Sequence, residues 1–114
     1  MSNSIQNLNV KLTELQENVL CHLAVSNDYQ NICKNLNLKA ITMSKILSSL
    51  REKNLYVNQN ITPEGEKMVN YLKFRNQTIL SFLNKYNLSK STEIYNQLRI
   101  LDFEAIIALK NALV

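Results

Sequence analysis

The stretch LSSLREKNLYVNQNITPEG, residues 47–65, contains the strongest signals for the fold of this chain. Its first half continues an amphipathic helix, and residues 55–57 form a short run of high β propensity. A polar turn cluster follows at residues 58–60. Thr62 is then a favourable helix N-cap, and Pro63 occupies the first helical position, where proline is tolerated. The stretch therefore predicts a helix, a minimal two-stranded hairpin and the start of another helix.

Three helical patterns lead up to and into this stretch. Thr13 and Gln16 have the T-x-x-Q spacing of a capping box, and the helix that they begin ends near Val25. Either Asn27 or Asp28 can cap a short second helix. The third helix covers residues 40–53.

The third helix has one apolar and one polar side. Its apolar side is formed by Ile41, Ile46, Leu47 and Leu50, with Met43 at the edge. The opposite side is polar, and its residues are Thr42, Ser44, Lys45, Ser48 and Arg51. A helix of this kind rests on a core and exposes a polar face.

A helical region follows Gly65. Its long amphipathic pattern allows an interruption at residues 73–76, and two shorter helices follow, one over residues 92–100 and one capped by Asp102. With a single glycine and a single proline in 114 residues, the chain is expected to be mostly α. Residues 1–11 form either one helical turn or an ordered arm.

Composition limits the class of protein. The chain is 46% apolar and lacks a run of about 18 apolar residues, so we expect a globular protein with no membrane partner. The N-terminus lacks the pattern of a signal peptide, and Cys21 and Cys33 have neither metal nor redox spacing, so a cytoplasmic location is expected. A net charge of +4 favours an anionic partner.

Nothing in the sequence predicts an enzyme. Cys21 and His22 are neighbours on a helix, so their side chains diverge by about 100° and cannot form a nucleophile–base pair. The single glycine argues against a phosphate-binding loop, and no paired-histidine metal motif is present. We expect no catalytic residues, no cofactor and no bound metal.

The order of elements predicts DNA binding. In a winged helix–turn–helix unit, two helices support a third that enters the major groove of double-stranded DNA. Small polar residues on the third helix let its backbone approach the groove, while lysine and arginine reach phosphates or guanine. Lys34 and Lys39 flank the preceding turn. The predicted DNA-binding residues are Lys34, Lys39, Thr42, Ser44, Lys45, Ser48 and Arg51.

Residues 47–57, followed by Ile61-Thr62-Pro63-Glu64-Gly65, resemble the recognition helix, wing and helix start of winged helix regulators. Both the MarR-like and the diphtheria-toxin-repressor-like groups have this pattern. The segment Phe74-Arg75-Asn76, with Ile79-Leu80 and Phe82-Leu83, is similar to the start of the dimerisation region in the iron- and manganese-dependent repressors, which favours that family. The resemblance covers residues 12–110 and implies a DNA-binding domain at 12–66 and a helical dimerisation region at 67–114, after the N-terminal arm at 1–11.

The metal ligands of that family are mostly missing. Its ligand positions fall on Glu17 and Leu20, on Asn76, and on Arg99, Asp102 and Phe103. Two carboxylates beside a guanidinium cannot supply the converging donors that a divalent ion needs. We therefore expect a regulator without metal control.

Two functions follow from this reasoning. The first is a homodimeric transcription regulator that binds DNA half-sites about one helical turn apart. The second is an interaction module that binds RNA polymerase or another regulator, which the short uncharged wing favours.

Overall fold

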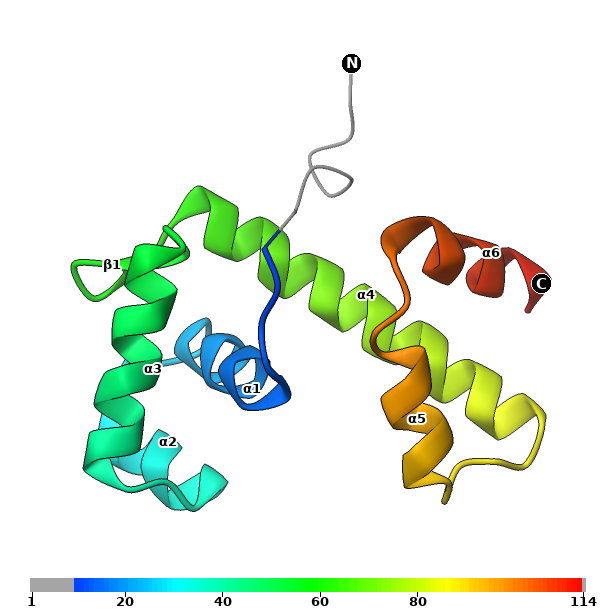
Figure 1. The fold of residues 1–114 in the computed structure, drawn as a ribbon, viewed down its shortest axis with the longest axis horizontal. Coiled ribbons are helices and arrows are strands. Elements are labelled where there is room, and N and C mark those ends of the chain that lie inside the picture. Colours follow the sequence, from blue (N-terminus) through cyan, green and yellow to red (C-terminus); the bar gives the residue numbers. More distant parts are fainter. Residues whose placement is uncertain (1–9, 114) are drawn as a thin grey trace. The chain divides into compact units, whose positions relative to one another are not determined.

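The computed structural model describes residues 10–113 and is mostly helical (Figure 1). The described elements are α1 (Glu14–Leu23), α2 (Tyr29–Leu36), α3 (Ala40–Glu52), β1 (Tyr56–Val57), β2 (Asn60–Ile61), α4 (Pro63–Lys85), α5 (Thr92–Leu98) and α6 (Phe103–Ala112). This confirms the mostly α class and the two-stranded hairpin, and the order is compatible with a winged helix. None of the described helices is long and apolar enough to cross a membrane. The predicted arm lies almost entirely outside the described residues.

The chain divides into two compact units between Asn70 and Tyr71. The first part of α4 belongs to the first unit, and the remainder belongs to the second with α5 and α6. The sequence placed this division four residues earlier, after residue 66.

The first unit is built on capped helices that pack on one another. The capping box at α1 is confirmed: Thr13 Oγ1 accepts from the Gln16 amide at 3.1 Å, and Gln16 Oε1 accepts from the Thr13 amide at 3.0 Å. Asp28 caps α2 by accepting from the Asn31 amide. α1, α2 and α3 contact one another, and α3 also contacts β1. The buried apolar side chains of this unit are Val19, Leu20, Leu23, Ile32, Met43, Ile46, Leu50, Leu55, Tyr56, Met68 and Val69.

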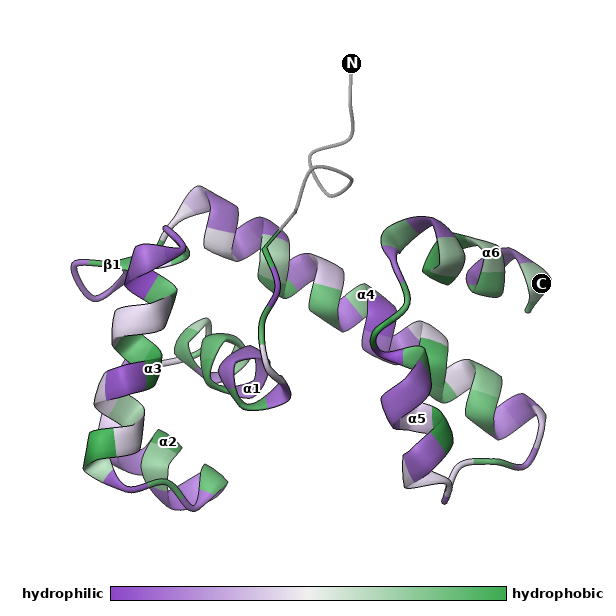
Figure 2. Ribbon diagram, in the orientation of Figure 1, coloured by the Kyte–Doolittle hydropathy of each residue, from purple (hydrophilic) through white to green (hydrophobic). Residues whose placement is uncertain are grey.

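The apolar side of α3 differs from the prediction. Met43, expected at the edge, is only 3% exposed, whereas Ile41, expected in the core, is 66% exposed. At about 100° per residue, the buried residues Met43, Ile46 and Leu50 share one side of the helix, and Ile41 lies nearly opposite them. The assignment of Ile41 to the apolar side was therefore wrong. Figure 2 shows hydrophilic and hydrophobic residues interspersed along α3.

The hairpin of β1 and β2 and the start of α4 both lie within residues 47–65. Tyr56 pairs with Ile61 and Val57 with Asn60, which leaves a two-residue turn. Thr62 is confirmed as a capping residue, since its Oγ1 accepts from the Gly65 amide at 2.9 Å. The same hydroxyl donates to the Asn54 carbonyl at 2.7 Å, so it ties the hairpin to the end of the α3 region.

The second unit has a small core of its own. Ile79 and Leu83 of α4 and Ile106 of α6 are fully buried, and half-buried apolar side chains pack around them: Phe74, Phe82, Leu88, Ile94, Tyr95 and Leu98. α4 continues through residues 73–76, so the interruption allowed by the sequence is absent. These residues include no glycine or proline, and Arg75 among them is buried with hydrogen-bond partners.

Candidate nucleic-acid interface

The outward side of α3 brings together four of the predicted DNA-binding residues. Ser44, Lys45 and Arg51 are exposed, and Ser48 is partly exposed. Ser44 and Ser48 are four residues apart and Lys45 and Ser48 three, so their side chains are neighbours on the helix surface. We call this side, with Ile41 and Glu52 included, the outward face of α3.

Thr42 lies on the flank of α3 rather than on the outward face. It is half-buried, and helical spacing places it on the same side as Ser49. Ser49 Oγ accepts from Gln16 Nε2 of α1 at 3.1 Å and from Lys53 Nζ at 3.2 Å. This flank of α3 therefore contacts α1 and is not free to face a partner in the way that the outward face is.

Lys34 and Lys39 lie on either side of the turn between α2 and α3. Lys34 is exposed in the last turn of α2, and Lys39 is exposed at the N-cap of α3. Asn37 ends α2 with a left-handed backbone (φ 56°), a conformation that asparagine tolerates better than most residues. The turn thus places one lysine before and one after the change of direction.

The segment from the end of α2 to the end of α3 is basic. Residues 34–53 contain five cations (Lys34, Lys39, Lys45, Arg51 and Lys53) and one anion (Glu52). The remaining residues carry eight cations and eight anions, and within them residues 67–90 form a second basic stretch with five cations and no anion. Such a local excess attracts a polyanion more strongly than the same charge spread over the surface.

A chain of hydrogen bonds holds the hairpin to the loop between α1 and α2. Tyr56 Oη donates to Asn27 Oδ1 at 3.0 Å, and the Tyr56 and Tyr29 hydroxyls share a hydrogen bond of 2.5 Å. Asn27 Nδ2 donates in turn to the Gln59 carbonyl at 2.8 Å. Burial, and then the Tyr29 hydroxyl, raise the pKa of Tyr56 above its ordinary value of 10.0. The hairpin is therefore fixed at its tip as well as its base.

The tip of the hairpin carries no charge. Asn58 and Gln59 both have positive φ (53° and 62°), as the two-residue turn of a tight hairpin requires. Their side chains and that of Asn60 are exposed amides. The tip can offer hydrogen bonds to a phosphate but no ionic attraction.

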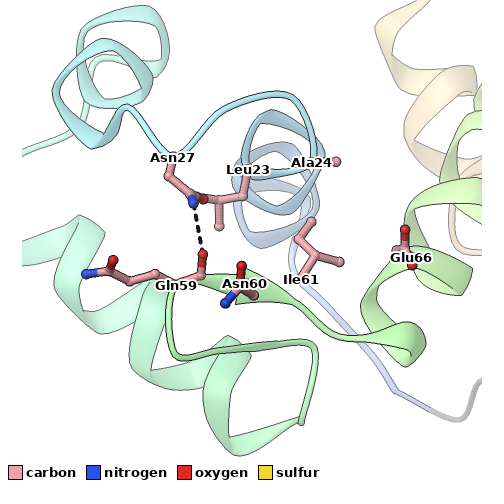
Figure 3. Close-up of a pocket in the computed structure, with 7 residues that line it drawn as sticks. All are labelled: Leu23, Ala24, Asn27, Gln59, Asn60, Ile61 and Glu66. Carbon is pink, nitrogen blue, oxygen red and sulfur yellow. Dashed lines mark hydrogen bonds between the residues drawn. The ribbon is translucent and has the colours of Figure 1, made fainter.

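A shallow pocket of about 210 Å³ lies between the hairpin and the end of α1 (Figure 3). The Asn27–Gln59 hydrogen bond joins two of the residues that line this pocket, as Figure 3 shows. Its lining residues are Leu23, Ala24, Asn27, Gln59, Asn60, Ile61 and Glu66. Both polar atoms of the Asn27 side chain are already bonded to the hairpin, to the Gln59 carbonyl and the Tyr56 hydroxyl.

The residues at the metal positions of the resembled repressors do not fit a metal ion. In the second unit, Asn76 Oδ1 accepts from Arg75 Nη2 at 2.8 Å, from Arg75 Nε at 3.1 Å and from Tyr95 Oη at 3.4 Å. Arg75 is only 4% exposed and also donates to the Arg99 carbonyl at 3.2 Å. Asp102 caps α6 by accepting from the Ala105 amide. A buried guanidinium thus occupies the acceptor that a metal would need, and no cluster of three metal-binding side chains occurs within residues 10–113.

Comparison of the chain with protein-family models, curated proteins and solved structures finds no match.

Two residues of the outward face were missed in the sequence analysis. Ile41 was assigned to the core because it is apolar, and Glu52 was not considered. The buried direction set by Met43, Ile46 and Leu50 would have placed both on the outward face. The role of Asn27 in holding the hairpin had no sequence signal, because its partners are about 30 residues away.

Proposed function

We propose that this protein is a transcription regulator that binds double-stranded DNA through a winged helix–turn–helix unit. The observation that carries the proposal is the local excess of positive charge on residues 34–53, which form the end of α2, the turn and α3 and hold five cations and one anion. α3 is the recognition helix in this proposal. Its outward face carries the small hydroxyl side chains of Ser44 and Ser48 beside Lys45 and Arg51, as a helix in the major groove requires.

The hairpin is the wing, and its contribution to affinity is small. A wing that enters the minor groove normally carries Arg or Lys, and Asn58, Gln59 and Asn60 carry no charge. Its hydrogen bond from Asn27 holds it close to the body of the unit. Most of the binding energy is therefore assigned to α3, Lys34 and Lys39.

The second unit serves as a dimerisation region in this proposal. It exposes large apolar side chains, with Ile100 at 74% and Leu80 at 50% exposure, which a two-fold contact would bury. A homodimer would present two copies of α3 to half-sites about one helical turn apart. Asn76 Oδ1 already accepts hydrogen bonds from the Arg75 guanidinium, which supports regulation without metal.

The second candidate function is binding to RNA polymerase or another regulator. Glu52 on the outward face and the uncharged hairpin tip favour this reading, because both would serve a protein surface better than a phosphate backbone. The two functions predict different behaviour with DNA alone.

Fluorescence anisotropy with genomic DNA fragments at moderate salt separates the two functions. DNA regulation predicts saturable binding to a subset of fragments, with affinity that falls steeply as salt rises. The protein-interaction function predicts only weak association that does not differ between fragments. Equal weak binding to every fragment would contradict the DNA proposal.

A further inference from the structure

We infer that Ile41 determines sequence specificity by packing on the C5 methyl group of a thymine in the major groove, an inference that rests on the proposed DNA-binding function. Ile41 is the second residue of α3 and is 66% exposed. Residues in the first turns of a recognition helix are the ones that contact base edges. Ile41 therefore occupies a position from which a base can be contacted.

The neighbours of Ile41 define the chemistry of its partner. Ser44 and Lys45 lie three and four residues further along α3 and adjoin Ile41 on the outward face. A single exposed isoleucine is ordinary on a protein surface. Here, however, it lies in a basic segment, residues 34–53, that holds five cations and one anion. The partner must combine dense negative charge with a small apolar group.

Thymine in duplex DNA supplies both features. In the major groove its C5 methyl is the apolar group that distinguishes it from the other three bases. An isoleucine side chain has few rotamers in a helix, so little conformational entropy is lost when it packs on the methyl. Removing one methyl group from water corresponds to about a fourfold gain in affinity.

The test uses the full chain and a DNA sequence enriched from a random duplex pool. Each thymine of the enriched duplex is replaced in turn by uracil, which removes only the C5 methyl, and dissociation constants are measured by anisotropy. We expect about fourfold weaker binding at one thymine of each half-site. Ile41→Ala should bind more weakly and lose its sensitivity to uracil at that position. Val25→Ala is the control, because it truncates a side chain that is 85% exposed in the loop after α1. It should bind with wild-type affinity and show the same weakening with uracil as the wild type.

The outcomes separate this inference from the proposed function. If the wild type binds the enriched duplex in a salt-dependent way but uracil has no effect at any position, the inference fails and the DNA-binding function stands. The inference also fails if Ile41→Ala keeps the wild-type sensitivity to uracil. If no duplex is enriched, both proposals fail, and Ile41 is better explained as a contact to a protein partner. Because Ile41 is exposed, its truncation should leave the melting temperature unchanged.

Discussion

Gly65 lies against the backbone of Leu55: a Cβ atom added to the glycine would stand 2.1 Å from the Leu55 carbonyl oxygen. It would also lie 2.9 Å from Ile61 Cγ2 of β2. Both distances are shorter than van der Waals contact, so the first turn of α4 can approach the hairpin only without a side chain at this position. The single glycine of the chain is thus explained by close packing.

The first prediction concerns Gly65→Ala. The added methyl should force α4 away from the hairpin and lower the free energy of unfolding by about 3 kcal/mol. Urea denaturation followed by circular dichroism measures this change. Asn70→Ala is the control, since it adds no bulk at an exposed position of α4 and should leave stability the same or slightly higher. If the urea midpoint of Gly65→Ala equals that of the wild type, Gly65 does not lie as close to the Leu55 carbonyl as described.

The second prediction concerns the alkaline titration of Tyr56. Because its pKa is raised above 10.0 in the folded protein, the folded state holds this proton more tightly than the unfolded state. The stability that Tyr56 contributes is therefore fully present below pH 10.0 and is lost as the pH rises above 10.0. Absorbance of tyrosinate should show one of the five tyrosines ionising last.

Two variants assign that late ionisation. Tyr56→Phe should remove it, and Tyr29→Phe should shift it to lower pH, because the Tyr29 hydroxyl is one of its causes. A late-ionising tyrosine that persists in Tyr56→Phe would contradict the assignment.

Local signals in the sequence predicted much of the first unit. Thr13, Asp28 and Thr62 act on backbone groups within three residues, so their spacing alone identifies the helix starts. The exposure of Ile41 was not predicted because residue type was given more weight than helical angle. Two other contacts were not predicted: the hydrogen bond between Asn27 and Gln59, and the close approach of Gly65 to Leu55. Each depends on how separate segments pack in space, and a single sequence carries no information on such contacts.

The third prediction is that DNA binding is independent of transition metals. Asn76 is already bonded to Arg75, whose buried guanidinium would repel a divalent ion. Adding Mn²⁺ or Fe²⁺ should change the affinity for DNA only as much as Mg²⁺ at the same ionic strength. Stronger binding with Mn²⁺ than with Mg²⁺, reversed by a chelator, would argue for a functional metal site.

The fourth prediction concerns dimerisation. Sedimentation velocity at micromolar concentration should show a dimer, and Leu80→Asp or Ile100→Asp should dissociate it, because each places a charge on an exposed apolar position of the second unit. Val25→Asp in the first unit should remain dimeric. If the wild type is a monomer at all concentrations, or if all three variants behave alike, the assignment of the second unit is refuted.

In the proposed function α3 contacts the phosphates of DNA, and the salt dependence of binding measures those contacts. Each phosphate contact that is lost should reduce the slope of log affinity against log salt by about 0.9. The Lys45→Ala/Arg51→Ala variant should therefore bind more weakly, with a slope reduced by about 2 per chain. Lys90→Ala/Lys110→Ala removes the same charge from exposed positions of the second unit and should keep the wild-type slope. A slope reduced equally in both variants, or in neither, would contradict the account.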